Sequence, residues 1–247
     1  MSFLMRRGII SSVVSGATFD ANTSSLNGST QYYTVPHQTY YQTSNITVSA
    51  FVRITSLGIN QTIINKQDRN SNSTQSWSLR VNTSDQLEIF IRQSGATIVI
   101  MTDTVSLSAD TWYHVGFTFD GATSRLYKDG VNIQSSSTVS SIQQTTEPVL
   151  IGSAISLTTP QRFLAGSIAL VDIQSITLST PQMLDLATAT CFDDRSVNAT
   201  SVGYWSLANG GDLAIGQEET DLSVNGNDLT PVGSPTYTDQ DLVVQCA

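Results

Sequence analysis

Charged side chains are scarce in this sequence. Only 13% of its 247 residues are Asp, Glu, Lys or Arg, against roughly 25% in an average soluble domain. Lysine and arginine together number 11 and the acidic residues number 20, which gives a formal net charge of −9. Because a nucleic-acid surface needs clustered basic side chains, this balance predicts no nucleic-acid partner. The surface must consist mainly of hydroxyl and amide groups.

Long hydrophobic runs are also missing from the sequence. No stretch reaches the roughly eighteen apolar residues of a membrane-spanning helix, so we expect no membrane partner. The stretch GIISSVVSGA after Arg6 and Arg7 is too short and too rich in serine for the core of a signal peptide. We therefore expect residues 1–19 to form an N-terminal arm that docks on a partner, with Arg6 and Arg7 as candidate docking residues.

Cysteine and histidine occur only twice each. Cys191 and Cys246 are too few for a disulfide framework. They could form one bridge that fixes the C-terminal segment to the body, or remain two reduced thiols, and the sequence leaves both open. The two histidines, His37 and His114, are not accompanied by a G-x-S-x-G motif, so nothing indicates nucleophilic catalysis.

Hydroxyl and amide residues take the place of charge. Stretches such as NTSSLNGST suit exposed strand faces and turns better than helices. Short apolar or alternating segments recur between turn signals, which is typical of a β-sandwich or jelly roll. The predicted strands are 47–54, 61–66, 76–81, 86–92, 96–102, 111–120, 124–130, 148–152 and 166–177. One helix is predicted across the end of the sandwich over 179–189, where Ser179 or Thr180 can cap and Pro181 suits the first turn.

The alternation of apolar residues assigns the two faces of the predicted strands. In the segment 86–92, Leu87, Ile89 and Ile91 share one face, and the opposite face carries Glu88, Phe90 and Arg92. In the segment 111–120, one face carries Tyr113, Val115, Phe117 and Phe119. His114 then lies on the other face as a packed strand histidine, and the Asp-Gly pairs at 120–121 and 129–130 form turns.

Several motifs resemble those of one known family. TWYHVGFTFDGATSRLYKDG (111–130) resembles the W-x-H-V and Y-x-D-G signature of the laminin-G-like, concanavalin A-like lectin/glucanase superfamily. LNGSTQYYTVP (26–36), SAFVRI (49–54) and LSTPQMLDL (178–186) resemble its opening strand, core strand and closing helix, in the same order. The resemblance implies an all-β protein: an antiparallel jelly-roll sandwich over residues 20–190, with one short helix near 180–189.

Residues 191–247 form a predicted C-terminal extension of that sandwich. GYWSLANGG (203–211) and DLSVNGNDLTPVGSPTY (221–237) resemble segments that usually precede the sandwich in such modules, yet here they come last. The extension therefore either completes the sandwich of its own chain or adds a strand to a neighbouring subunit.

The resemblance also suggests a calcium site, but the residues that replace the acidic stretches of the family argue against one. The acidic stretches of the family are replaced by Asn27–Gln31 and by Ala169 and Leu170. These replacements remove carboxylates that Ca²⁺, with six to eight oxygen ligands, would use. We expect no cofactor, and the remaining weak candidates for a calcium site are Asp193, Asp194, Asp221 and Asp228.

A glycan-binding site is predicted in the segment YYTVPHQTYYQ (32–42). Sugars stack on exposed aromatic rings and bond to nearby polar groups. The candidate residues are Tyr40, Tyr41 and His37. The alternative is that one tyrosine of each pair packs inward and the other covers a sheet edge.

Catalysis is not expected. Retaining glucanases of this superfamily carry an E-x-D-x-x-E string that sets two carboxyl groups roughly 5 Å apart, and no such string occurs here. The leading hypothesis is a non-enzymatic bacteriophage virion protein (a capsid decoration, tail or fibre component) assembled in the host cytoplasm without a signal peptide. Its partners would be other virion proteins or further copies of itself, and a cell-surface glycan. The alternatives are a free carbohydrate-binding lectin and a degenerate glycoside hydrolase.

Overall fold

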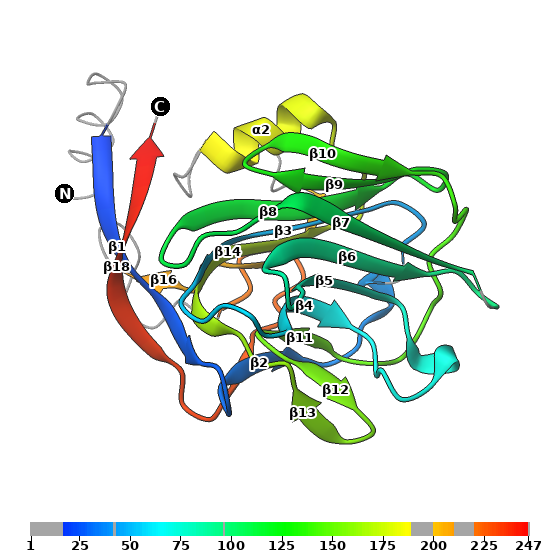
Figure 1. Cartoon of the computed structure of the whole chain (residues 1–247), viewed down its shortest axis with the longest axis horizontal. Coiled ribbons are helices and arrows are strands. Elements are labelled where there is room, and N and C mark those ends of the chain that lie inside the picture. Colours follow the sequence, from blue (N-terminus) through cyan, green and yellow to red (C-terminus); the bar gives the residue numbers. More distant parts are fainter. Residues whose placement is uncertain (1–16, 42, 96, 189–199, 210–219, 247) are drawn as a thin grey trace.

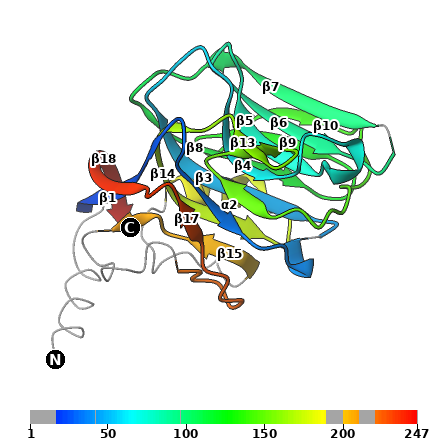
Figure 2. The same ribbon diagram turned by 90° about the horizontal axis from the view of Figure 1, so that it is seen from below.

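The fold is a sandwich of two antiparallel β-sheets with an α-helix on its outside (Figures 1 and 2). The computed structural model describes residues 17–41, 43–95, 97–188, 200–209 and 220–246. The predicted antiparallel jelly-roll sandwich with one short helix is confirmed. Arg6, Arg7, Cys191, Asp193 and Asp194 lie outside the described residues, as does the side chain of Cys246.

The larger sheet has nine strands. Its order is β10 (Val131–Ser136), β9 (Ser124–Lys128), β8 (Trp112–Phe119), β3 (Ile46–Ile54), β14 (Ala165–Gln174), β1 (Ala17–Asn27) and β16 (Ala208–Asn209). In addition, β15 (Ser201–Trp205) pairs with β14, and β18 (Thr236–Cys246) pairs with β1. The strands β1, β15, β16 and β18, which lie near the two ends of the described chain, are therefore part of one sheet.

The second sheet has seven strands. Its order is β17 (Thr230–Val232), β2 (Tyr32–Val35), β11 (Val149–Ile151), β4 (Gln61–Lys66), β5 (Trp77–Val81), β6 (Gln86–Arg92) and β7 (Ile98–Ser106). A small hairpin of β12 (Ala154–Ser156) and β13 (Thr159–Gln161) stands beside it. Two short 3-10 helices, η1 (Thr39–Tyr41) and η2 (Asn72–Thr74), interrupt the connections.

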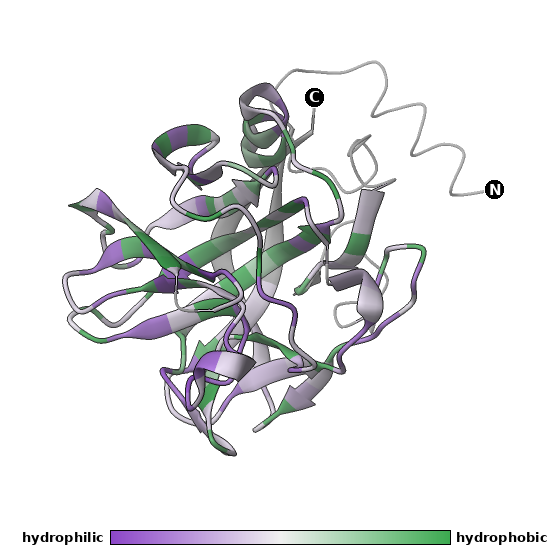
Figure 3. Ribbon diagram, turned by 90° about the vertical axis from the view of Figure 1, so that its right-hand side faces the viewer, coloured by the Kyte–Doolittle hydropathy of each residue, from purple (hydrophilic) through white to green (hydrophobic). Residues whose placement is uncertain are grey.

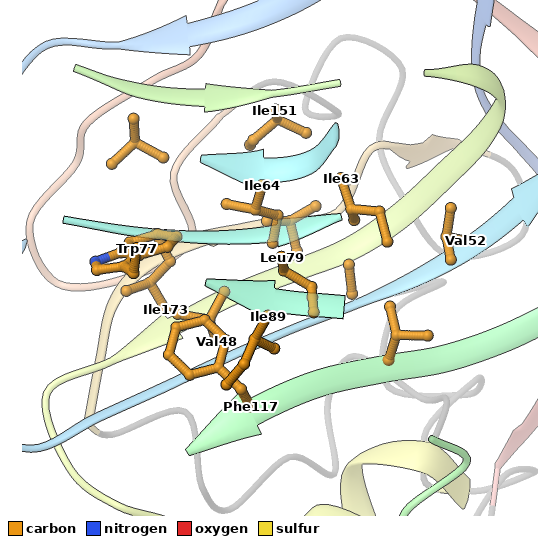
Figure 4. Close-up of a cluster of buried hydrophobic side chains, with 14 of the residues drawn as sticks. Val48, Val52, Ile63, Ile64, Trp77, Leu79, Ile89, Phe117, Ile151 and Ile173 are labelled. Carbon is orange, nitrogen blue, oxygen red and sulfur yellow. The ribbon is translucent and has the colours of Figure 1, made fainter. Parts of the chain in front are cut away.

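The core lies between the two sheets and is built by the predicted alternation. Val115, Phe117 and Phe119 of β8 are fully buried. Phe117 packs on Trp77 of the opposite sheet, with ring centroids 5.7 Å apart (Figure 4). Figure 3 shows hydrophobic and hydrophilic residues alternating along the strands, as expected when one face of each strand is buried. His114 faces away from this core and is buried beside the ring of Phe51.

The helix α2 (Thr180–Thr188) covers the outer face of the nine-stranded sheet rather than the end of the sandwich. Its residues Met183 and Leu186 are buried together with Tyr127 of β9. A Cβ atom at Gly116 of β8 would lie 3.0 Å from the Met183 methyl group and 2.7 Å from a backbone oxygen. The absence of a side chain at this strand position therefore lets the helix approach the sheet. No helix of the described residues is long and apolar enough to cross a membrane.

The C-terminal strands complete the two sheets of this chain. Trp205 of β15 is fully buried, and its indole Nε1 donates a hydrogen bond to the carbonyl oxygen of Asn227 at 2.9 Å. Gly203 makes room for this ring, because a Cβ atom there would lie 2.4 Å from it. The boundaries at residues 19 and 190 stay predictions, but the strands after residue 200 pair with β14, β1 and β2.

We expect Trp205→Ala to lower the free energy of unfolding by about 3–5 kcal/mol, because it leaves a cavity in the core and an unpaired carbonyl group. Val224→Ala is the matched control in the same segment, since Val224 is 88% exposed and its truncation should change stability by about 0.5 kcal/mol or less. Urea unfolding of the two variants and the parent measures both values. Equal stability of the two variants would show that the C-terminal strands do not contribute to the core.

Candidate functional site

The two tyrosines of the predicted glycan patch have different environments. Tyr40 and Tyr41 lie in η1, with ring centroids 4.9 Å apart and an interplanar angle of 70°. Tyr41 is 2% exposed and belongs to the core, whereas Tyr40 is half-buried. The Tyr40 hydroxyl accepts a hydrogen bond from Nδ2 of Asn227. Burial raises the pKa of both tyrosines. Of the pair, only Tyr40 presents part of its ring to a ligand.

His37, the third predicted glycan-binding residue, contacts a buried lysine. The Nζ atom of Lys66 lies 3.1 Å from Nδ1 of His37 and donates to the carbonyl oxygen of Glu147 at 2.7 Å. Lys66 is 1% exposed, and this burial lowers its pKa to about 8. Burial, followed by the positive charge of Lys66, also lowers the pKa of His37. His37 is half-buried, and both causes favour the uncharged form of its ring.

The two described calcium candidates organise a loop. Asp221 is buried, and its Oδ1 accepts from the backbone N–H groups of Tyr204 and Ser223, while its Oδ2 accepts from that of Asn227. Asp228 Oδ1 accepts from the backbone N–H of Asp221 at 2.9 Å. Within the part of the chain that the structure describes, no group of three or more His, Cys, Asp and Glu could hold a metal ion. These carboxylates fold the segment 221–228 against Trp205.

A different cluster lies on the outer face of the seven-stranded sheet. We call it the arginine face, and it comprises Arg69, Arg80, Arg92 and Arg162. The alternation that buries Leu79 and Val81 turns Arg80 to this face.

Strand pairing sets Arg80 in a transverse row. Arg80 pairs with Thr62 of β4 on one side and with Glu88 of β6 on the other, and Glu88 pairs with Thr102 of β7. The backbone oxygen of Arg162, directly after β13, accepts from the N–H of Thr62 at 2.9 Å. Hydrogen bonds of the backbone therefore fix the relative positions of all these residues.

Two of the four arginines are held by partners. Nε of Arg80 donates to Oε1 of Glu88 at 2.5 Å, and the Thr102 hydroxyl donates to Oε2 of the same carboxylate at 3.1 Å. Nε of Arg92 donates to Oε1 of Gln75 at 2.8 Å. The guanidinium carbons of Arg80 and Arg92 lie 5.6 and 5.8 Å from the centroid of the Phe90 ring, within the range of a cation–π contact. Phe90 thus supports both side chains.

The other two arginines have no such partner. Arg69 lies in the connection after β4, where its backbone N–H donates to the carbonyl oxygen of Ile155 at 2.9 Å. No hydrogen bond or ion pair of the described residues involves the guanidinium group of Arg69 or Arg162. Burial, followed by the charges of Arg69 and Arg80, lowers the pKa of Arg162 to about 10. Burial and then the charge of Arg80 lower the pKa of Arg69. Positive charge is concentrated here in a chain of net charge −9.

Sequence reasoning did not identify the arginine face as a site. The alternation in 86–92 did indicate that Glu88, Phe90 and Arg92 share a face, and the structure confirms this. Arg69 and Arg162 lie in connections, where no periodic pattern shows that they approach Arg80.

The chain belongs to the concanavalin A-like lectin/glucanases superfamily. Its sequence matches the Laminin_G_3 family of that superfamily over residues 27–183, which is more than half of the chain. This match confirms the resemblance seen in the motifs. No curated protein sequence matches the chain significantly.

Solved structures share the fold. A protein from Bacteroides ovatus ATCC 8483, described as a "putative carbohydrate binding protein", superposes with a TM-score of 0.67 and 18% sequence identity, over 92% of this chain and 62% of that one. The chain thus spans less than two thirds of that protein. The heptameric SAP-like pentraxin from Limulus polyphemus superposes with a TM-score of 0.56 and 14% identity, over 92% of this chain and 95% of that one. At these identities the likeness shows the fold alone.

The lowered pKa of Lys66 predicts a pH-dependent stability. Unfolded lysine keeps its proton to about pH 10.5, whereas folded Lys66 loses it above about pH 8. Between these values the unfolded state binds more protons, so the free energy of unfolding rises with pH. We expect the parent to gain stability relative to Lys66→Met as the pH rises from 7 to roughly 10. Urea unfolding of both proteins across this range measures the difference between their free energies of unfolding. A difference that stays constant with pH would contradict the prediction.

Proposed function

We propose that the chain is a non-catalytic carbohydrate-binding protein whose ligand contacts the arginine face. The observation that carries this proposal is the row of polar side chains that the strands hold on the outer face of the seven-stranded sheet. Sugars are recognised by hydrogen-bonding groups held in fixed positions on a rigid scaffold. The likeness in fold to the Bacteroides ovatus protein supports the same class of ligand.

The carboxylates of this sheet favour binding over cleavage. On the outer face of β4 to β7, the described strands carry one carboxylate, Glu88, and it is engaged by Arg80 and Thr102. Asp103 of β7 lies on the opposite side, where it is buried and pairs with Lys128 of the other sheet. A glycosidase requires two carboxyl groups that flank the bond to be broken. The arrangement around Glu88 supplies one.

The variant Glu88→Gln distinguishes carbohydrate binding from glycoside hydrolysis. In a glycan-array experiment, we expect the parent to bind glycans and to release no reducing ends from the glycans it binds. Tyr40→Ala should keep the array pattern, because the hydroxyl of Tyr40 already contacts Asn227 and the proposed ligand lies on another surface. Release of reducing ends by the parent, lost in Glu88→Gln, would identify a hydrolase. If Tyr40→Ala loses the array pattern while Arg162→Ala keeps it, the glycan-binding site lies at η1 and not on the arginine face.

We also propose that this binding protein is a virion component, with other virion proteins or further copies of itself as partners. The two long strands β1 and β18 favour attachment at one end, because Ala17 pairs with Cys246 and both described ends therefore lie together. Figure 1 shows this ribbon projecting beyond the sandwich on the side away from the tips of β6 and β7. Attachment through the ribbon would leave the arginine face open to a cell-surface glycan. Assembly would take place in the host cytoplasm.

Antibodies raised against the purified protein test the virion proposal. Immunogold electron microscopy of particles from the source host should label intact particles at one structural location, and mass spectrometry of those particles should detect the chain. An unrelated bacteriophage from the same host is the control. Absence of the chain from purified particles would overturn the virion role and leave a free lectin.

A further inference from the structure

The guanidinium groups of Arg69 and Arg162 are the starting point. Both side chains are half-buried, both lie close to Arg80, and neither has a hydrogen-bond or ion-pair partner among the described residues. Placing like charges together in a partly desolvated site opposes folding. An anionic ligand would offset that cost, because it would pair with charges that the protein leaves unpaired.

A long arginine side chain can also serve to cover apolar surface, but this role does not explain Arg69 and Arg162. Arg92 fits that explanation, since it lies over Phe90 and donates to Gln75. Arg80 is likewise held, by Phe90 and Glu88. Arg69 and Arg162 differ because their guanidinium groups make no hydrogen bond or ion pair among the described residues, although the charge of Glu88 acts on Arg162 from a distance. Their N–H donors remain available to a ligand.

A buried hydroxyl group gives a second, independent indication of a ligand. Thr62 is 1% exposed, and its Oγ1 has no hydrogen-bond partner. It lies between the residues in question, since its backbone N–H bonds to the carbonyl of Arg162 and its strand partner is Arg80. Buried hydroxyl groups are usually paired. As the direct strand partner of Arg80, Thr62 carries its side chain on the same face of the sheet as the arginine.

The chemistry of the face selects the kind of anion. Arginine presents a planar fork of N–H groups that matches a carboxylate in a bidentate manner. Glu88 carries a negative charge on the same row, and it disfavours a doubly charged phosphate more than a singly charged carboxylate. Its oxygens can also accept hydrogen bonds from sugar hydroxyl groups. This combination suits a sugar that bears one carboxylate.

We propose that Arg69 and Arg162, beside the fixed Arg80 and the hydroxyl of Thr62, bind the carboxylate of an acidic sugar. The inference rests on the proposed carbohydrate-binding function and specifies its ligand as an anionic glycan. Phe90 is a positioning residue, because it supports Arg80 and Arg92 without facing the ligand charge. Glu88 orients Arg80 through their ion pair.

Isothermal titration calorimetry with defined probes tests this site. Glucuronic acid and N-acetylneuraminic acid supply the carboxylate from two kinds of sugar, glucose is the neutral probe, and glucose 6-phosphate is the doubly charged anion. The parent should bind at least one acid more tightly than glucose and glucose 6-phosphate, with an affinity that falls as salt is added. Arg162→Ala and Arg69→Ala should each weaken this binding by about tenfold or more, the effect of losing a charge-assisted hydrogen bond.

Arg125→Ala is the matched control. Arg125 is also a half-buried strand arginine, but it pairs with Asp120 on the nine-stranded sheet, so its loss should leave the binding of acidic sugars unchanged. The melting temperature of Arg162→Ala without ligand should be no lower than that of the parent, because an unpaired charge has been removed. Should that variant fail to fold, Arg162→Lys replaces it. Lysine keeps the charge without the planar fork, so weaker binding supports the proposal and equal binding overturns it.

The possible outcomes separate this inference from the function on which it rests. Acidic glycans bound on the array with full affinity by both Arg162→Ala and Arg69→Ala would overturn the acidic-sugar site and keep the carbohydrate-binding function. Glucose 6-phosphate bound as tightly as the acids would overturn the preference for a carboxylate. If no glycan on the array binds, neutral or acidic, both the function and the inference are wrong.

Discussion

The two-residue period of the strands β5 and β6 is the constraint on which the rest of the structure depends. It sends Leu79, Ile89 and Ile91 into the core and turns Arg80 and Phe90 to the outer face. A slip of one residue in the pairing would bury the arginine and expose the core residues. The hydrophobic core therefore fixes the register, and the register fixes the positions of the charges outside.

The low charge of the chain gives the arginine face its importance. Four of the 11 basic residues gather on one side of one sheet in a protein whose net charge is −9. Such a concentration costs free energy unless partners or ligands compensate it. Glu88 and Gln75 compensate two of the four. The backbones of the remaining two are held by hydrogen bonds, from the N–H of Arg69 to Ile155 and from the N–H of Thr62 to the carbonyl oxygen of Arg162.

The sequence predicts the strands much better than the site, for a physical reason. The strands 61–66 and 86–92 occur with the predicted bounds, because burial of one face leaves a visible period. β7 extends beyond the predicted end at 102 to Ser106 because its polar end still pairs with Gln86. The neighbours Tyr40 and Tyr41 lie in a 3-10 turn, where a period of two says nothing about which ring is buried. Arg69 and Arg162 meet only because distant connections fold over the same sheet.

The C-terminal strands also limit where a ligand can bind. Asn227 connects them to η1, since its carbonyl accepts from the indole of Trp205 and its side chain donates to Tyr40. Asp221 holds the same loop by accepting three backbone N–H groups. Tyr40, Asp221 and Asp228, three of the residues predicted as glycan or calcium candidates, thus make contacts that close the sandwich. Thr62 Oγ1 and the guanidinium groups of Arg69 and Arg162, which have no hydrogen-bond partner among the described residues, lie instead on the outer face of the seven-stranded sheet. This is the face on which we propose that the ligand binds.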